Sequence, residues 1–347
     1  MLLKRLVIAT ATLAALGFGF ADRCAEAQNL EKITVTSGGE GMHYFPIYVA
    51  RGAGFFKEEG LDADWVNVNS GSRQAASIMG GSAEITPLGL YHVVESHAQG
   101  GNLVAIASLF DVYAMTLVLS NDAYQKSGIQ EGMTIDEKVN RLKGFQIAVS
   151  APGSSTDMLI RSLFRARGMD VDKVLKLQPL GNDASIMAAF DKKVTDGFIW
   201  TAPLPEIVSV KGLGKVVVNP FTGEVPELND VPFVALVTSR ETLAAKPAKI
   251  RAAMRAVTKA LIFSHEHPAE TRKIMRQYFP ELEDSVYEVM VEKYRLATSK
   301  SPMITPDQIA RTVTWMNLGQ PTPYAANYLD IVDPAMAQET LAALPHK

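Results

Sequence analysis

The sequence predicts an α/β protein built as two lobes, and two observations support that fold class. Segments with the alternation of strands and segments with helical periodicity follow one another along the chain, in two separate series. The length of 347 residues corresponds to two units of ~100–200 residues each. The hydrophobic fraction of 47% is sufficient for a core in each unit.

The first series of elements occupies residues 33–119. A helix is predicted at 46–57, with Pro46 at its start and Gly60 at its end, and a shorter one at 72–79, where Ser72 is able to act as the N-cap. Alternating or apolar stretches predict strands at 33–36, 65–68, 83–88, 103–109 and 115–119. This order of elements is typical of an α/β layer with a largely parallel sheet.

The second series has the same character, and a helical tail follows it. Strands are predicted at 146–150, 174–177, 198–201, 216–218 and 233–238, and helices at 154–167 and 183–191. Residues 249–318 have an almost wholly helical periodicity. The joins near 111–120 and 225–238 are partly extended, so we expect two crossovers that act as hinges between the lobes.

The composition excludes several classes of protein. A formal net charge of −3 argues against a nucleic-acid binder, which needs a basic surface. A single cysteine excludes a disulfide framework and a thiolate zinc cluster. No phosphate-binding loop, dinucleotide fingerprint or nucleophile elbow occurs. His265 and His267 are spaced so that their rings point apart on a helix, and we expect no metal and no cofactor.

The first residues predict a signal peptide, residues 1–27, rather than part of the fold. Two basic residues open it, an uncharged run over 6–20 follows, and the sequence Ala-Glu-Ala supplies a cleavage site. The run is shorter than the ~20 residues of a membrane span. Cleavage near Ala27 removes Cys24, so we expect a soluble, exported, periplasmic monomer without cysteine.

The stretch from Tyr48 to Asp62, YVARGAGFFKEEGLD, carries a resemblance to a known family. It resembles the signature A-x-x-x-G-[YF]-F-K-x-E-G-L of bacterial solute-binding proteins for nitrate, sulfonates, taurine and the pyrimidine precursor of thiamine. Three further stretches agree with that family in order and spacing, at residues 80–84, 142–149 and 190–197. In the last of them Val194 and Gly197 depart from the usual residues.

This resemblance implies the periplasmic-binding-protein-like II architecture, with a cleft between two lobes and two extended crossovers. Residues 28–115 and 234–347, with the C-terminal helices, then form lobe I, and residues 116–233 form lobe II. It also implies capture of a small molecule by lobe closure and delivery to the permease and ATPase of an ABC importer. We expect a sulfonate, aromatic or pyrimidine-like ligand with an anionic or polar head.

Candidate ligand-binding residues of lobe I follow its predicted strands, because parallel sheets bind ligands at the carboxyl ends of their strands. They are His43, Tyr44, Gly71, Ser72, Thr86, Phe110 and Tyr113. We interpret His43 and Tyr44 as one wall of the cleft and Phe45 as core. The helix that opens at Ser70 has either an anion site or a simple N-cap. Asp111 either receives a ligand cation or braces the hinge.

Candidate ligand-binding residues of lobe II are Gly153, Ser154, Ser155, Thr156, Asn182 and Trp200. The run 153–156 is the best single candidate, because a glycine turn and three hydroxyl residues open a helix whose positive end favours an anionic head group. A well-capped helix without a ligand is the alternative. Trp200 either stacks on a planar ligand or belongs to the core. We expect Met115, Met158 and Met187 to be core residues.

Three classes of function fit these features. The export signal and the family motifs favour a transport receptor. A sensory module that presents its ligand to a membrane kinase has the same features. An enzyme is the third reading, since one eukaryotic branch of the superfamily makes the thiamine pyrimidine with a cysteine-rich motif. The chain after residue 27 has no cysteine, so we predict no catalytic residue.

Overall fold

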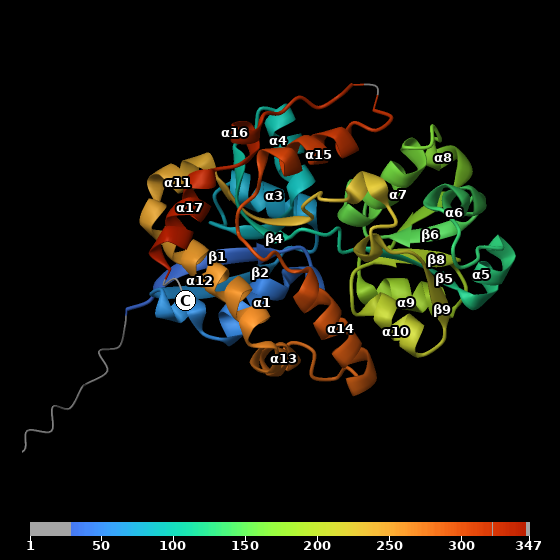
Figure 1. Ribbon diagram of the computed structural model, residues 1–347, viewed down its shortest axis with the longest axis horizontal. Helices are drawn as coiled ribbons and strands as arrows, with labels where there is room; N and C mark the ends of the chain where they lie inside the picture. Colours follow the sequence, from blue (N-terminus) through green and yellow to red (C-terminus); the bar gives the residue numbers. More distant parts are fainter. Residues whose placement is uncertain (1–28, 321, 345–347) are drawn as a thin grey trace, which may run out of the picture.

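The computed structural model describes residues 29–320 and 322–344, which form two α/β lobes side by side (Figure 1). The predicted signal peptide, residues 1–27, and Cys24 lie outside the described residues. Within the described part of the chain, no helix has both the length and the apolar character needed to cross a membrane.

The strands of the first lobe form one continuous surface. They are β1 (Glu31–Ser37), β2 (Leu61–Asn67), β3 (Thr86–Gly89), β4 (Leu103–Phe110) and β10 (Val234–Ser239). β1 and β2 are parallel, with Ile33 opposite Ala63, and β10 runs antiparallel between β3 and β4. A parallel bridge between Val35 and Ile85 joins the two groups. The resulting strand order is β2-β1-β3-β10-β4.

The second lobe repeats this plan with its own strands. They are β5 (Thr116–Ser120), β6 (Gln146–Val149), β7 (Lys176–Pro179), β8 (Gly197–Trp200) and β9 (Gly214–Val218), in the order β7-β6-β8-β5-β9. β6 is parallel to β7 and β8, whereas β5 is antiparallel to β8 and β9. Each lobe therefore has three parallel strands, then one antiparallel strand, then an edge strand.

The prediction of largely parallel sheets is wrong for β5 and β10. Each of these strands enters its sheet directly from a crossover that leaves the other lobe. No helix precedes either strand to return the chain in the same direction, so antiparallel pairing is open to both. The predicted order of strands along the chain is confirmed, with ends that differ by a few residues.

Helices cover both faces of the first sheet and extend into the C-terminal part of the chain. They are η1 (Met42–Tyr44), α1 (Phe45–Gly52), α2 (Phe55–Glu58), α3 (Gly71–Met79), α4 (Leu90–Ala98), α11 (Arg240–Ala245), α12 (Pro247–Glu266), α13 (Pro268–Arg276), α14 (Asp284–Ala297), α15 (Pro306–Met316), α16 (Tyr328–Ile331) and α17 (Pro334–Ala343). The helical tail is thus confirmed. The single helix predicted at 46–57 is wrong, because Gly54 adopts a left-handed φ of +83° between α1 and α2.

The helices of the second lobe flank its sheet. They are α5 (Asn121–Ser127), α6 (Ile135–Arg141), α7 (Ser155–Arg165), α8 (Val171–Val174), α9 (Asp183–Asp191) and α10 (Leu204–Val210), followed by the short turns η2 (Pro220–Thr222) and η3 (Pro226–Leu228). The helices predicted at 154–167 and 183–191 are confirmed as α7 and α9.

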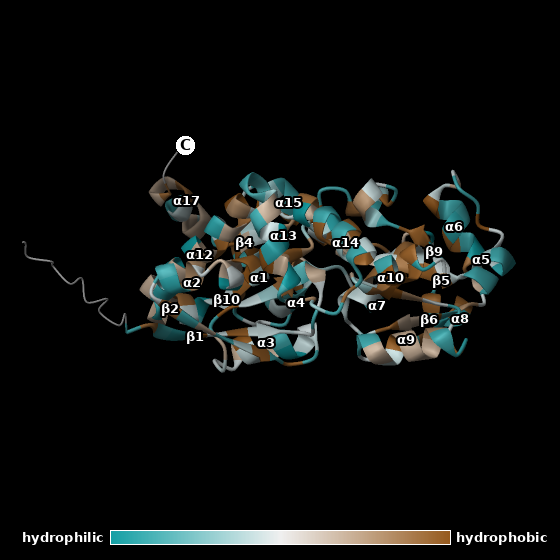
Figure 2. Cartoon of the chain, turned by 90° about the horizontal axis from the view of Figure 1, so that it is seen from below, coloured by the Kyte–Doolittle hydropathy of each residue, from teal (hydrophilic) through white to brown (hydrophobic). Residues whose placement is uncertain are grey.

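Apolar residues gather on the strands and on the inner faces of the helices (Figure 2). All side chains of β3, β4, β8 and β10 are buried. In the second lobe, Phe190 of α9 packs edge-on against Phe198 of β8, with ring centroids 5.2 Å apart. The larger cluster of buried residues extends through both lobes, and a smaller cluster around Phe198 lies within the second lobe.

Helix α14 lies between the lobes (Figure 1) and contacts both. The hydroxyl of Tyr294 on α14 accepts a hydrogen bond from the amide of Ala202 (2.9 Å) and donates one to the carbonyl of Ala114 (3.3 Å). Lys293 pairs with Glu206 of α10 at 2.8 Å. The lobe boundaries predicted at 115/116 and 233/234 stay a prediction.

Two glycines test this description of the backbone. Gly54→Ala forces a side chain into the left-handed region, which costs about 1–2 kcal/mol. Gly197→Ala places a Cβ atom 2.2 Å from the carbonyl oxygen of Val118 on β5, and we expect a loss of about 3 kcal/mol. Urea unfolding followed by circular dichroism measures both. Equal losses, or a larger loss for Gly54→Ala, would contradict the close approach of β5 and β8.

Candidate functional site

A cavity of about 350 Å³ lies between the lobes, where the carboxyl ends of their parallel strands face each other. Lobe I lines it with the turns after β1 and β2 and with the end of β3. Lobe II lines it with residues 150, 181–184 and 200–201, which follow β6, β7 and β8. Met115 and Phe233 from the two crossovers complete the lining.

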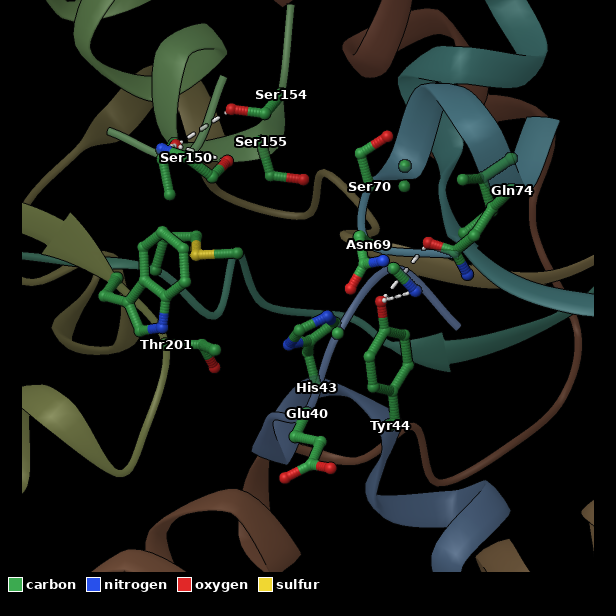
Figure 3. A pocket seen from close by; sticks show the side chains of 18 of the residues that line it. Glu40, His43, Tyr44, Asn69, Ser70, Gln74, Ser150, Ser154, Ser155 and Thr201 are labelled. Atoms are coloured by element: carbon green, nitrogen blue, oxygen red, sulfur yellow. Dashed lines mark hydrogen bonds between the residues drawn. The ribbon is translucent and has the colours of Figure 1, made fainter. Parts of the chain in front are cut away.

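Figure 3 shows side chains of the two lobes facing each other across this space: Ser150, Ser154, Ser155 and Thr201 on one side, and Glu40, His43, Tyr44, Ser70 and Gln74 on the other.

Hydrogen bonds fix the wall of lobe I. The hydroxyl of Tyr44 accepts from the amide of Gly38 (2.8 Å) and donates to Oε1 of Gln74 (3.2 Å). Nε2 of Gln74 in turn donates to the hydroxyl of Thr86 (2.7 Å) and to the carbonyl of Pro87 (2.8 Å). Thr86 donates to the carbonyl of Thr36 at 2.8 Å. This wall is therefore preorganised by buried polar contacts.

The start of α7 forms the opposite wall. Ser154 is its N-cap and accepts from the amide of Asp157 at 3.4 Å, while its own hydroxyl donates to the carbonyl of Ala151 at 2.6 Å. The hydroxyl of Thr156 accepts from the amide of Ser150 (2.9 Å) and contacts the hydroxyl of Ser154 (2.9 Å). Most polar groups of this turn thus bind one another, as in the alternative of a well-capped helix.

Two tyrosines of lobe I and the first crossover reach the start of α7. The hydroxyl of Tyr91 on α4 lies 3.3 Å from the hydroxyl of Ser155 and donates to the carbonyl of Gly153 at 3.3 Å. The hydroxyl of Tyr113 donates to the carbonyl of Ser155 at 2.8 Å. These contacts join the wall of lobe I and the first crossover to the start of α7.

Aromatic rings form a third surface, the aromatic wall, which consists of His43, Tyr44, Trp200 and Phe233. The rings of His43 and Tyr44 have centroids 3.9 Å apart, and His43 lies 6.1 Å from Phe233. Burial lowers the pKa of His43 to about 3, so its imidazole is neutral at physiological pH. The aromatic wall therefore offers ring faces without a fixed charge.

The carboxyl group of Asp183, which has a raised pKa, also lines the cavity. Oδ1 of Asp183 accepts a hydrogen bond from Nε1 of Trp200 at 3.0 Å. Burial raises the pKa of Asp183 to about 6, and the charge of Glu40 adds to the increase, whereas the indole donor opposes it. Asp183 is therefore mostly ionised at neutral pH and becomes protonated in mildly acidic solution.

The structure brings together at the cavity His43, Tyr44, Gly71, Ser154, Ser155, Thr156, Asn182 and Trp200, as the sequence predicted. Their role in ligand binding stays a prediction. Five other candidates lie outside the lining: Ser72, Thr86, Phe110, Tyr113 and Gly153.

Each of these five has a local reason for its position. Ser72 is exposed on α3, and Ser70 rather than Ser72 caps that helix. Thr86 is fully buried and supports Gln74. Phe110 is buried against the ring of Tyr294, and Tyr113 against that of Phe233. Gly153 is exposed, and its amide donates to Asp157.

Several lining residues were not among the candidates, namely Glu40, Gln74, Tyr91, His92 and Asp183. Glu40 lies in the turn between β1 and His43, and Asp183 directly follows Asn182, so their position after a strand was a usable signal. Tyr91, His92 and Gln74 lie inside helices, where sequence gives no such mark. Met115 is a buried core residue, as predicted, and it also borders the cavity.

Contacts resolve one of two open readings. Asp111 accepts from the hydroxyls of Ser108 (2.7 Å) and Ser299 (2.8 Å), so it braces the end of β4. Trp200 is 8% exposed and belongs both to a core cluster of lobe II and to the cavity lining, so its role as a stacking partner stays a prediction. No group of three or more histidine, cysteine or acidic side chains suited to a metal occurs among the residues that the structure describes.

One curated protein resembles this chain in sequence. The chain is 24% identical over 282 residues to YtlA of Bacillus subtilis (strain 168), whose name classes it as a binding protein, and the match covers 80% of each chain.

Solved structures resemble it in fold. A protein of Bordetella bronchiseptica RB50 has a TM-score of 0.79 at 21% identity, over 90% of this chain and 98% of that one. The alkanesulfonate-binding protein SsuA of Xanthomonas axonopodis pv. citri, bound to MOPS, has a TM-score of 0.63 at 17% identity, over 83% and 90%. The ligand-binding component of an ABC-type import system from Staphylococcus aureus has a TM-score of 0.67 at 15% identity, over 90% and 99%.

Two lobes around a shared cavity, together with these likenesses, define the fold of a periplasmic binding protein. The model of the NMT1-like family matches residues 31–278, and the chain belongs to that family. The resemblance seen in the sequence motifs is thereby confirmed.

The acidity of Asp183 provides a direct test of the site. In a carbon-13 NMR titration of the side-chain carboxyl, we expect a midpoint near the pKa of about 6. Trp200→Phe removes the indole donor and should raise that midpoint, whereas Glu40→Gln removes a neighbouring negative charge and should lower it. Shifts of the same sign in both variants would contradict the arrangement.

Proposed function

We propose that this protein is an extracytoplasmic solute-binding protein that captures a small organic molecule between its lobes. The observation that supports the proposal best is the cavity, whose lining comes from both lobes and both crossovers. A solute in that position contacts both lobes at once, so it favours the closed arrangement over an open one. This function needs no covalent step, and we propose no enzymatic activity.

Some of the contacts between the lobes are single hydrogen bonds at the cavity, which fits a reversible trap. Tyr91 meets Ser155 and Gly153 at 3.3 Å, and the amide of Met42 donates to the carbonyl of Ala202 at 3.3 Å. Hydrogen bonds of this kind contribute about 0.5–1.5 kcal/mol each. A bound solute adds enough to decide between open and closed states, because such states differ by only a few kcal/mol.

The proposed destination of the solute is the permease of an ABC importer with its ATPase. The likeness to the Staphylococcus aureus import component supports this role, and SsuA supports an organic ligand. In this proposal the protein is a periplasmic monomer whose signal peptide is removed near Ala27. Its lobes are residues 28–115 with 234–347, and residues 116–233. The aromatic wall supports a ring-containing or apolar solute with a polar head.

A thermal-shift screen tests the proposal, because a ligand that binds only the native state raises the melting temperature. The panel holds sulfonates, aromatic carboxylates, oxyanions, pyrimidines, and aromatic amines and amidines. At least one compound should raise the melting temperature by several degrees. No shift with any compound would count against solute capture.

Trp200→Ala should weaken binding of the best compound by about tenfold, which is ~1.4 kcal/mol, because it removes a ring face and the partner of Asp183. Calorimetric titration measures the affinity. Phe190→Leu is the matched control: Phe190 packs on Phe198 in the core of the same lobe and lies outside the cavity lining, so it should lower the melting temperature without changing affinity. An unchanged affinity in Trp200→Ala would place Trp200 outside the binding surface.

A further inference from the structure

The cavity has no fixed positive charge. Among its described lining residues, Glu40 and Asp183 are the carboxylates, and no lysine or arginine is present. Glu40 follows β1 of lobe I (Figure 3), whereas Asp183 opens α9 of lobe II. Both residues line the same cavity, from opposite lobes. Closing the lobes therefore brings two negative groups together unless a solute lies between them.

At three helix starts near the cavity, those of α3, α7 and α9, an acid in the first turn or a side-chain cap weakens the preference for an anion, whereas the start of α4 after Gly89 has neither. Asp157 lies in the first turn of α7, and Asp183 in the first turn of α9. At the start of α3, the side chain of Ser70 accepts from the amide of Arg73 at 3.3 Å. The hydroxyls of Ser154 and Thr156 bind each other and the backbone. The side-chain amides of Asn67, Asn69 and Asn182 also line the cavity, but they are neutral donors and do not offset the two carboxylates.

A buried acceptor without a partner adds to the two carboxylates. His92 is 6% exposed, and its Nδ1 lies 3.2 Å from a carboxylate oxygen of Glu95. Because a carboxylate only accepts, Nδ1 carries the proton in the neutral ring and Nε2 is the acceptor. This Nε2 has no hydrogen-bond partner and lies beside Gly71 of the lining. A buried acceptor of this kind is costly unless a ligand donates to it.

Resting on the proposed function, we infer that the solute is a flat, ring-containing organic cation. Its protonated amine or amidine group lies between Asp183 and Glu40, and its ring lies against the aromatic wall. The positive charge of the amine or amidine removes the repulsion between the two carboxylates. Binding of the solute therefore favours closure of the lobes. Ring faces of the aromatic wall attract a cation further. The volume of about 350 Å³ is at the low end of the ~300–1,000 Å³ of ligand pockets, which limits the solute to one or two rings.

Benzamidine, benzamide and benzoate test this inference, because they have nearly the same shape and differ in charge. Calorimetric titration and thermal shift at pH 7.5 should show binding of benzamidine, at least tenfold weaker binding of benzamide, and no binding of benzoate. Asp183→Asn and Glu40→Gln should each weaken the binding of benzamidine several-fold. The effect of Asp183→Asn should be the larger one, because Glu40 is exposed to solvent. Glu281→Gln removes an exposed carboxylate outside the cavity lining and should leave the affinity unchanged.

The pH dependence separates Asp183 from the other titratable groups of the lining, which are Glu40, His43, His92 and the tyrosines. Asp183 loses its negative charge as the pH falls through about 6. The affinity for benzamidine should therefore fall several-fold between pH 7.5 and pH 5, and this dependence should disappear in Asp183→Asn. In Glu40→Gln the pH dependence of the affinity should persist, and its midpoint should lie at a lower pH than in the unchanged protein.

Three results would count against the inference. If benzoate or benzenesulfonate binds more tightly than benzamidine, the solute is an anion and the inferred cation is wrong. The proposal that the protein captures a solute would still hold. No binding of benzamidine would exclude the cationic class, and the wider screen would then decide separately whether the protein captures any solute. An equal loss in Glu281→Gln would also count against it, because the effect would then not belong to the cavity.

Discussion

One buried hydroxyl joins the parts of the chain on which the cavity depends. Tyr294 is fully buried on α14, accepts from the amide of Ala202, and lies 3.0 Å from the hydroxyl of Thr201. It also donates to the carbonyl of Ala114 in the first crossover. Thr201 and Met115, next to these partners, both line the cavity. The position of the end of β8 relative to the crossover, and hence the shape of the site, therefore depends on this junction.

The cavity combines a rigid polar frame with an acidic interior. Tyr44 and Gln74 are held by a buried network, and the hydroxyls at the start of α7 are largely used within their own turn. A solute meets the aromatic wall, the neutral amides of Asn67, Asn69 and Asn182, the carboxylates of Glu40 and Asp183, and the unpaired nitrogen of His92. The charged groups among these are both carboxylates, which is the basis for assigning a positively charged guest.

The sequence predicted the fold class, the succession of strands along the chain and the family, because periodicity and the stretch from Tyr48 to Asp62 are local signals. It also located His43, Tyr44 and Trp200 at the cavity, since residues after parallel strands converge at one edge. It did not locate Gln74 or His92, which reach the cavity through tertiary packing of helices. Thr86 was misjudged because its hydroxyl turns toward Gln74, a direction that no sequence pattern records.

Lobe closure is the central claim, and the distance between the lobes tests it most directly. Spin labels at Leu329 on α16 and Val194 after α9, both exposed, report on opposite lobes in a chain whose Cys24 is replaced by serine. Double electron–electron resonance then measures the separation with and without the compound that stabilises the protein most. We predict a narrower distribution at a changed mean distance when the compound is bound. An identical distribution in both samples would contradict a two-lobed trap.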